Sequence, residues 1–257
     1  MFPKNFRLHL FIWFWLILSF SLVSLFLIFR ASGYIINFKA KTIEKTGLIV
    51  ISSDPKSALL YLNGKFKEKT PCKLDYLRPG LYHIKIEKDG YLPWEKTEKV
   101  EAGQYIKEEA ILFLKNPEIR DSTSTNLDVE LSPKQADVPS DILNSIPNDA
   151  QDFSWDKNKD ILLYRTEYEI WLYLRKNEDG SENKIIARFS KPIQRVAFYT
   201  DYKHILFVTD LQLRIMEIDG GNDTKLLNLN TIEFALQQGG KEIIYKDNDI
   251  LKIAKVR

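Results

Sequence analysis

Cysteine and histidine are scarce in this sequence of 257 residues, which has one cysteine, Cys72, and three histidines. A single thiol excludes an intrachain disulfide and a CxxC redox pair, and it argues against a cysteine-based zinc site. His9, His83 and His204 have no partner at metal-ligand spacing, so we expect His83 and His204 on the surface or at a strand edge. We expect Cys72 to be a partly buried small residue rather than a nucleophile.

Catalytic motifs are missing as well. The sequence contains no Gly-x-Ser-x-Gly elbow, phosphate-binding loop or dinucleotide fingerprint. Asp156, Asn158 and Asp160 have the spacing of the first ligands of an EF-hand, but Ile161 stands where that loop needs glycine. A solvated hairpin turn is the simpler interpretation, both there and at residues 219–223. We therefore predict a protein that is not an enzyme, with no catalytic residue, cofactor or metal site.

Charge of one sign is not in excess. The chain has 37 basic and 35 acidic residues; three of the basic ones, Lys4, Arg7 and Arg30, lie in the first 30 residues, and no acidic residue precedes Glu44. Residues 31–257 therefore hold 34 basic and 35 acidic side chains, a net charge of −1. Binding of nucleic acid needs a clustered excess of Lys and Arg, so we expect no nucleic-acid partner.

One long apolar run is present. Residues 8–29 contain only His9 and three serines as polar members, and 22 helical residues span about 33 Å, enough for the hydrocarbon core of a bilayer. A cleaved signal peptide has a shorter apolar region of about 7–15 residues and an A-x-A-like site. We predict an uncleaved signal anchor, that is, a single transmembrane helix after a tail of residues 1–7.

The orientation of this helix is less constrained, because basic residues flank both of its ends. The folded mass follows the helix and only seven residues precede it. We therefore predict a cytoplasmic N-terminus and an extracytoplasmic soluble part in the cell membrane.

Residues 46–114 show a pattern typical of short strands. Apolar, β-branched runs are separated by turn signals about every ten residues, among them Asn63-Gly64, Pro79-Gly80 and Asp89-Gly90. No helical periodicity is present. The pattern predicts a small antiparallel β-sandwich.

The same residues resemble the PEGA domain, a small β-sandwich module of bacterial and archaeal surface and membrane-anchored proteins. The matching pieces are Ser53-Asp-Pro55-Lys-Ser57-Ala58, Tyr61-Leu-Asn63-Gly64-Lys65, Thr70-Pro71, Leu77-Arg-Pro79-Gly80-Leu-Tyr82, Lys88-Asp-Gly90-Tyr91, Trp94 and Gly103. The motif Pro-Glu-Gly-Ala that names the family stands here as Pro55-Lys-Ser-Ala58. The resemblance implies a structural or contact-making module without catalytic residues.

Four aromatic side chains of this module, Tyr61, Tyr82, Tyr91 and Trp94, are candidates for contact with a glycan or a protein partner. Their positions near strand ends fit an exposed carbohydrate-binding platform. They fit packing in the core equally well.

Residues 115–149 differ in composition from both neighbours. They hold four of the ten prolines and seven acidic against three basic residues. We predict an extended linker. Residues 127–131 alternate and could instead form a strand, and residues 141–144 could begin a short helical turn.

Residues 150–257 contain an internal repeat. A strand pattern around Trp155 and residues 160–164 recurs around Phe198 and residues 203–208, and again around Phe234 and residues 241–245. Asp179-Gly180 and Asp219-Gly220 follow the first two units at the same spacing. We predict three or four antiparallel strands in each unit.

These units look like blades of a WD40- or TolB-type β-propeller. The chain ends after the inner strands of the third unit, and a ring needs about 4–8 blades, so the predicted segment is a partial propeller. Bare sheet edges in an open array favour pairing, which suggests self-association through this segment.

The predicted fold class is mainly β: a transmembrane helix, a PEGA-like antiparallel sandwich, a linker and partial β-propeller-like repeats. We expect a membrane-anchored binding or scaffolding protein of the cell envelope. Its partners would be the lipid bilayer, through residues 8–29, and envelope proteins or cell-wall glycans. The alternatives are a cell-wall carbohydrate-binding module and an envelope hydrolase.

Overall fold

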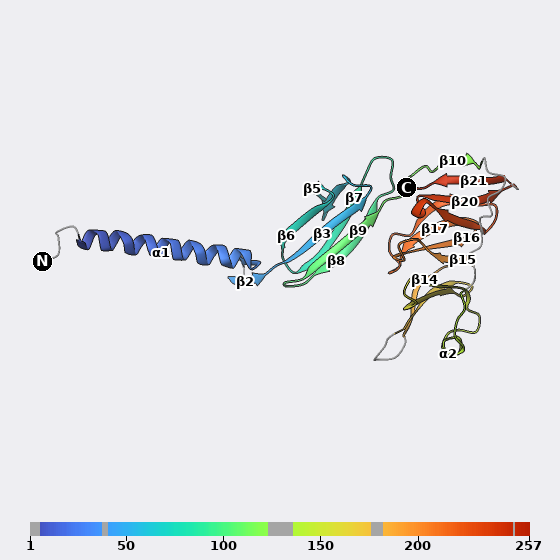
Figure 1. Ribbon diagram of the computed structural model, residues 1–257, viewed down its shortest axis with the longest axis horizontal. Helices are drawn as coiled ribbons and strands as arrows, with labels where there is room; N and C mark the ends of the chain where they lie inside the picture. Colours follow the sequence, from blue (N-terminus) through green and yellow to red (C-terminus); the bar gives the residue numbers. More distant parts are fainter. Residues whose placement is uncertain (1–5, 38–40, 123–135, 176–181, 249) are drawn as a thin grey trace. The chain divides into compact units, whose positions relative to one another are not determined.

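The computed structural model describes residues 6–37, 41–122, 136–175, 182–248 and 250–257. It confirms a mainly β protein with one long helix (Figure 1). Its contacts divide the chain into two compact units, Met1–Ile86 with Thr97–Ala110, and Glu87–Lys96 with Ile111–Arg257. Each unit is described by itself below. The turn at Asp179-Gly180 and the possible strand at residues 127–131 lie outside the described residues.

The first unit begins with helix α1, Phe6–Ala31, which contains the predicted residues 8–29. Twenty-six residues at a rise of about 1.5 Å each extend over about 39 Å. The segment Phe11–Ala31 is long and apolar enough to cross a membrane, and none of its apolar window is buried in the protein. Large side chains such as Trp13, Phe20 and Leu25 are more than half exposed.

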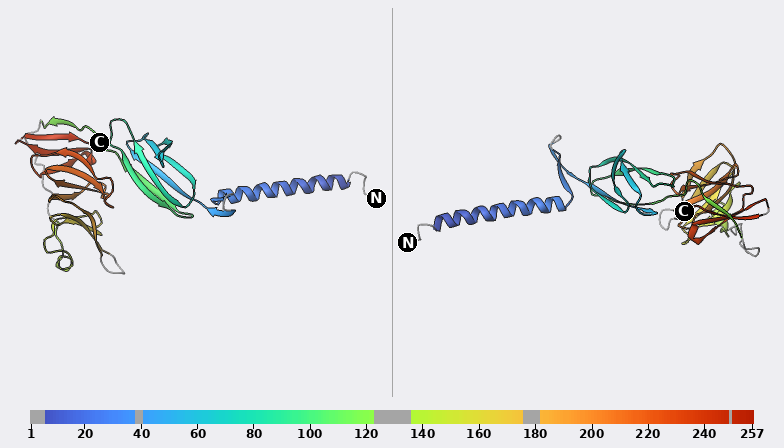
Figure 2. Two further views of the ribbon diagram at one scale, coloured as in Figure 1. Left: turned by 180° about the vertical axis from the view of Figure 1, so that it is seen from behind. Right: turned by 90° about the horizontal axis from the view of Figure 1, so that it is seen from above.

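A β-hairpin that was not predicted follows the helix (Figure 2). Strands β1, Tyr34–Asn37, and β2, Thr42–Lys45, pair antiparallel. Only Ser32 and Gly33 separate α1 from β1, and the φ of +80° at Gly33 is one that favours glycine. Only Thr46 separates β2 from the next strand, so the helix, the hairpin and the sandwich are joined without a linker.

The rest of the first unit is the predicted sandwich of two antiparallel sheets. One sheet has the order β6-β3-β9, with strands Cys72–Leu77, Gly47–Asp54 and Tyr105–Ile111. The other has the order β5-β4-β7-β8, with strands Lys65–Lys69, Leu59–Leu62, Gly80–Glu87 and Trp94–Val100.

Alternation along these strands builds the core of the sandwich. In β3 every second residue is buried, including Ile49 and Ile51, and β7 contributes Ile84 and Ile86, all four with no exposed surface. The period of two sends these side chains to one face of each sheet. The predicted Asn63-Gly64 turn joins β4 to β5 with positive φ at both residues.

The second unit contains three four-stranded antiparallel sheets, as the repeat predicts. The first sheet is β11-β12-β13-β14, with strands Gln151–Trp155, Ile161–Arg165, Glu169–Leu174 and Glu182–Arg188. The second is β15-β16-β17-β18, with strands Ile193–Phe198, His204–Thr209, Gln212–Glu217 and Thr224–Asn228.

The last unit ends at its inner strands, as predicted, but the third sheet also contains a strand from elsewhere in the chain. It contains β19, β20 and β21, which are Phe234–Gln237, Glu242–Asp247 and Ile250–Lys255; the short helix η1, Gln238–Gly240, lies between the first two. Its fourth strand is β10, Glu118–Asp121, which pairs antiparallel with β21. A segment from before the repeats therefore completes the last repeat.

The prediction of an extended linker at residues 115–149 is therefore wrong for part of the described residues. Besides β10 they contain helix α2, Ser140–Leu143. Val138, Ile142 and Ile146 are buried in one cluster with Leu162, Tyr164 and Tyr173 of the first sheet. The proline-rich composition predicted an extended segment. The segment folds instead because apolar side chains spaced four residues apart pack on one face of that sheet.

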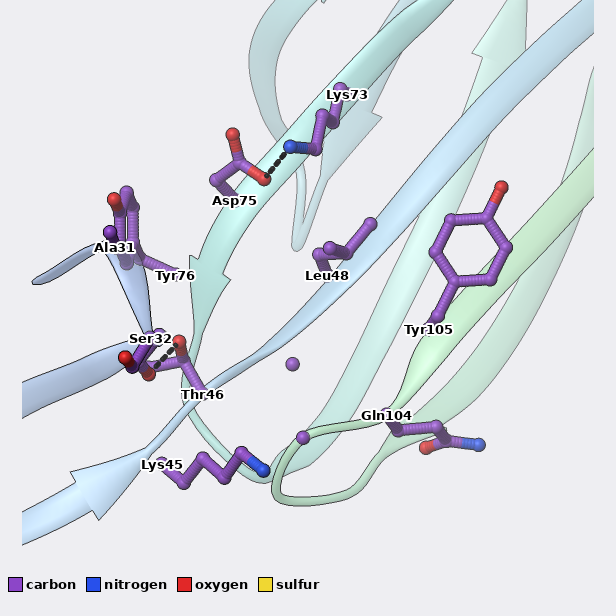
Figure 3. A pocket seen from close by; sticks show the side chains of 13 residues that line it. Ala31, Ser32, Lys45, Thr46, Leu48, Lys73, Asp75, Tyr76, Gln104 and Tyr105 are labelled. Atoms are coloured by element: carbon purple, nitrogen blue, oxygen red, sulfur yellow. Dashed lines mark hydrogen bonds and ion pairs between the residues drawn. The ribbon is translucent and has the colours of Figure 1, made fainter. Parts of the chain in front are cut away.

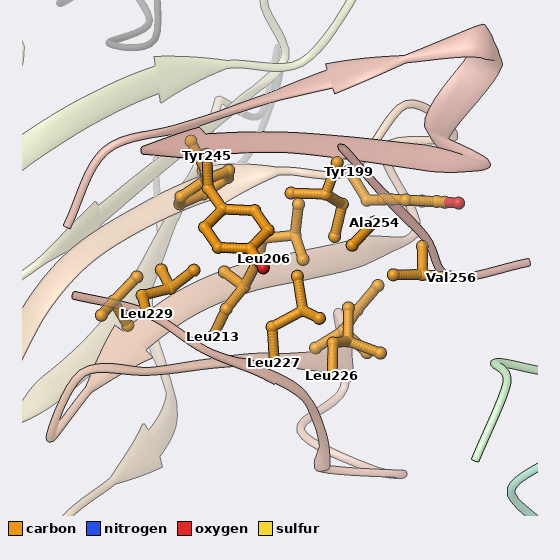
Figure 4. Close-up of a cluster of buried hydrophobic side chains, with 14 of the residues drawn as sticks. Tyr199, Leu206, Leu213, Leu226, Leu227, Leu229, Tyr245, Ala254 and Val256 are labelled. Atoms are coloured by element: carbon orange, nitrogen blue, oxygen red, sulfur yellow. The ribbon is translucent and has the colours of Figure 1, made fainter. Parts of the chain in front are cut away.

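Two further clusters lie between successive sheets. Alternate residues of β16, which is buried along its whole length, point in opposite directions. Ile205 and Phe207 pack towards the first sheet with Leu163 and Ile170. Leu206 and Val208 pack towards the third sheet, in the larger cluster drawn in Figure 4 with Leu213, Leu227, Tyr245, Ala254 and Val256.

Candidate functional site

A cavity of about 260 Å³ lies in the first unit, where the hairpin enters the sandwich (Figure 3). Its lining comes from the end of α1, the end of β2, the start of β3, strand β6 and the loop before β9. The lining residues are Ala31, Ser32, Gly33, Lys45, Thr46, Gly47, Leu48, Lys73, Asp75, Tyr76, Gly103, Gln104 and Tyr105.

Backbone contacts fix the wall of this cavity. The N–H and the hydroxyl of Thr46 both donate to the carbonyl oxygen of Gly33, at 2.8 and 2.7 Å. The N–H of Gly103 donates to the carbonyl of Thr46. A Cβ atom at Gly103 would lie 2.9 Å from Cε and Nζ of Lys45, so glycine leaves the space that the lysine side chain occupies.

The charged groups of the cavity are two lysines and one aspartate. Lys73 Nζ lies 2.9 Å from Asp75 Oδ1 in an exposed ion pair. The guanidinium of Arg30, in the last turn of α1, lies 4.2 Å from the ring centroid of Tyr76. Amines, hydroxyls and amides of this kind can bind the oxygen atoms of a polar ligand.

A second cavity, of about 250 Å³, lies in the second unit beside β16 and β17. Its charged residues form two oppositely charged pairs, Lys191 with Asp210 and Arg214 with Asp223. These pairs leave the cavity without a net charge.

The four aromatic residues predicted to contact a partner line neither cavity. In the first unit, Tyr61 is half-buried with its ring edge-to-face against Phe66, and the hydroxyl of Tyr82, also half-buried, donates to the carbonyl of Arg78. In the second unit, Tyr91 forms an isolated bridge with Leu114. A contact role for these three tyrosines stays a prediction.

Trp94 is only 3% exposed, which favours the interpretation as a packed residue over that as a binding platform. Its indole N–H donates to the carboxylate of Glu217 within the second unit. Lys96 lies 3.3 Å from the same carboxylate and 3.1 Å from that of Asp219. Burial by itself raises the pKa of Asp219, but the N–H of Gly221 and the charge of Lys96 outweigh it and lower that pKa.

His204 corrects the prediction of a surface histidine, because it is 5% exposed. Its Nδ1 lies 2.7 Å from Oδ2 of Asp201, whose other oxygen accepts the backbone N–H groups of Lys203 and His204. Asp201 lies in the turn between β15 and β16, and His204 is the first residue of β16. Burial raises the pKa of Asp201, and these hydrogen bonds together with the histidine outweigh it and lower that pKa.

The acidic turn at residues 156–160 is the predicted hairpin turn. The carboxylate of Asp156 accepts the backbone N–H groups of Asn158, Asp160 and Ile161, so its oxygens serve the turn itself. Within the described ranges, no group of three or more His, Cys, Asp or Glu side chains could hold a metal ion.

The residues of the first cavity were not identified from the sequence. The available signal was the group of basic residues around the end of the apolar run, of which Lys45 lines the cavity. Lys73, Asp75 and Tyr76 are distant in sequence from that run, and only the pairing of β3 with β6 brings them beside it.

Comparison with known proteins gives a match for one part of the chain. Residues 46–112 match the family described as the PEGA domain. No curated protein matches the chain.

Several solved structures share limited similarity with the chain. The β-propeller domain of Swd1 from Myceliophteria thermophila is 11% identical, with a TM-score of 0.33 over 69% of this chain and 48% of that one. An oligogalacturonate lyase in complex with manganese is 8% identical, with a TM-score of 0.34 over 81% of this chain and 64% of that one. TolB from Acinetobacter baumannii is 10% identical, with a TM-score of 0.31 over 82% of this chain and 56% of that one.

The chain therefore spans about half to two thirds of the length of these three structures. The match at residues 46–112 covers both sheets of the sandwich, including the Asn63-Gly64 turn. Residues 46–112, which match the PEGA domain, follow an apolar helix and precede the strands of three antiparallel β-sheets.

Proposed function

We propose that this protein is a membrane-anchored, extracytoplasmic, non-enzymatic protein that binds or scaffolds other components of the cell envelope. The observation that carries the proposal is the exposed apolar surface of α1. The most apolar part of this helix is not buried against any other part of the protein. Each large apolar side chain left in water costs about 1.5–3 kcal/mol relative to burial. A bilayer relieves that cost for the whole helix.

Membrane association and orientation are tested in one experiment on cells that express the full chain. We expect the protein to remain in the membrane fraction after a carbonate wash. We expect protease added to intact cells or spheroplasts to digest residues 50–257. Protection of those residues until lysis would contradict the extracytoplasmic orientation, and release by carbonate would contradict the anchor.

The binding role is supported by the PEGA match and by the surface chemistry of the sandwich. The cavity at its base offers lysine amines and hydroxyls, which suit recognition of a polar partner. Cross-linking of the full chain in cells should recover discrete envelope proteins. A pull-down on purified cell wall that retains the chain, and loses it on Tyr61→Ala or Tyr82→Ala, would instead support the carbohydrate-binding alternative.

An envelope hydrolase remains the second alternative. Purified full-length protein in detergent should show no turnover in a screen of glycan, ester and peptide substrates. Turnover that co-purifies with the chain would overturn the non-enzymatic proposal.

Self-association through the β-repeat segment also stays a proposal. The buried side chains beside α2 cover the face of the first sheet, and three of the four residues of β10 are charged, which discourages strand pairing at that edge. Ile119 and Ile250, which are 55% and 51% exposed on the third sheet, are candidates for such a contact. If light scattering shows that the β-repeat segment is monomeric at high concentration, this proposal is wrong.

A further inference from the structure

The hairpin β1–β2 has two chemically different faces. Its register pairs Tyr34 with Lys45 and Ile36 with Ile43. Because side chains alternate along a strand, these four residues lie on one face. Ile35, Thr42 and Glu44 lie on the other face, where the hydroxyl of Thr42 donates to the carboxylate of Glu44 at 3.2 Å.

The two isoleucines of the first face are exposed side by side. Ile36 is 45% exposed and its cross-strand partner Ile43 is 64% exposed. Directly opposite residues in a hairpin have Cβ atoms about 5 Å apart, so the pair forms one continuous apolar surface. Lys41, just before β2, and Lys45 are exposed basic residues beside it.

Contacts at each face show which way the hairpin is turned. Tyr34, on the isoleucine face, stacks on Phe29 near the end of α1, with ring centroids 5.3 Å apart. Glu44, on the other face, lies 3.8 Å from Arg78 of the sandwich. The isoleucine face thus adjoins the helix through Tyr34, while Lys45 at the base of that face and Glu44 on the other face both reach the sandwich. The hairpin projects to one side of the helix end (Figure 2).

We propose that the isoleucine face of this hairpin lies in the interfacial layer of the lipid bilayer. The inference rests on the proposed membrane anchor, because the helix end then places the hairpin at the membrane surface. Tyrosine, lysine and aliphatic side chains on one face, continuous with an apolar helix, match the chemistry of that layer. The lysines would meet lipid phosphates, and the isoleucines would leave water.

One consequence concerns the cavity at the base of the sandwich. Lys45 belongs to the isoleucine face and also lines that cavity. With the hairpin in the interface, the cavity opens at the level of the lipid headgroups, and the sandwich is held close to the membrane surface.

The test uses the full chain with Cys72→Ala, reconstituted in vesicles of phosphatidylethanolamine and phosphatidylglycerol. Single cysteines at Ile43→Cys and, as a matched control on the opposite face of the same strand, Thr42→Cys carry an environment-sensitive fluorophore. Ile36→Cys repeats the measurement on the partner strand, so that a local distortion at residue 43 does not decide the outcome. Val23→Cys in α1, with vesicle flotation, reports the anchor separately.

We expect probes at residues 43 and 36 to emit at shorter wavelength than the probe at residue 42. Quenchers on the lipid chains should quench those two probes severalfold more strongly, and aqueous iodide should do the reverse. Equal iodide quenching at 42, 43 and 36, with the Val23 position quenched from the lipid, overturns the inference and leaves the anchor standing. Failure to float, with no lipid quenching at residue 23, overturns both.

Discussion

Burial changes the chemistry of individual side chains in this protein. Cys72 is 8% exposed, and burial together with the charge of Glu68 raises the pKa of its thiol. Asp201 is affected in the opposite direction, because its hydrogen bonds to His204 and to two backbone N–H groups outweigh burial. The two pKa shifts predict the reactivity of Cys72 and the contribution of Asp201 to stability.

Cys72 should react slowly with alkylating reagents. The thiolate is the reactive form, so a raised pKa leaves less of it at pH 8 than in a free cysteine, and burial restricts access as well. We expect alkylation by iodoacetamide to be severalfold slower in the folded protein than after unfolding in urea, followed by mass spectrometry. Equal rates in the two states would contradict the buried environment.

Asp201→Asn should destabilise the second unit at pH 7. The pKa of Asp201 is lower in the folded protein than in the unfolded chain. Its contribution is therefore complete above the unfolded value near 4 and is lost as the pH falls through the lower folded value. We expect a loss of about 1–2 kcal/mol in the free energy of unfolding at pH 7, and a smaller loss at pH 3.

Denaturant unfolding in detergent at both pH values measures this loss. Asp210→Asn is the matched control, because the Asp210 side chain is 54% exposed in its ion pair with Lys191 and an exposed pair contributes about 0–1 kcal/mol. An equal effect of the two substitutions would contradict a special role for the Asp201–His204 pair.

At the scale of elements, segments that precede the repeats in the chain complete them. Strand β10 adds the fourth strand to the last sheet, and the residues around α2 cover the first sheet. A sheet stack leaves an apolar face at each end, and terminal repeats need such covers for solubility. β10 thus extends the third sheet by one strand, and the residues around α2 cover one face of the first sheet.

The cover at α2 can be tested with two adjacent residues. Ile142 is 1% exposed and Leu143 is 42% exposed in the same four-residue helix. We expect Ile142→Ala to cost about 2–5 kcal/mol through the cavity it leaves, and Leu143→Ala to cost much less. Hydrogen exchange should show lost protection in β12 and β13 for the first variant alone; similar exchange in both would refute the cover.

At the scale of the whole molecule, the chain has separate apolar cores. Ile51 belongs to the core of the sandwich, and Leu206 belongs to the cluster between the second and third sheets, both with no exposed surface. A contact-based division into two compact units follows the same separation.

Shortening a buried side chain in one core should therefore destabilise only the unit that contains it. We expect Leu206→Ala to lower the protection of amides in β15 to β21 by about 2–5 kcal/mol, with little change in β3 and β7. Ile51→Ala should have the converse effect. Hydrogen exchange followed by mass spectrometry separates the two, and a uniform loss over both units would show that they unfold as one.

Much of this architecture follows from short sequence patterns. The apolar run at residues 8–29, the alternation in β3 and β7, and the Asn63-Gly64 turn act over a few residues, so helix, sandwich and repeats could be predicted. The hairpin β1–β2 was not predicted, although Ile35 and Ile36 are β-branched, because each of its strands has only four residues.

The tertiary structure alone decided how distant segments combine. β10 is a strand of four residues, three of them charged, and its partner β21 begins about 130 residues later; no local pattern specifies that pairing. The same holds for Trp94, whose indole N–H donates to Glu217, and for the cavity, which needs the register of β3 with β6. Periodicity and turn chemistry are local properties of the chain, whereas burial and pairing depend on which distant residues fill the space beside it.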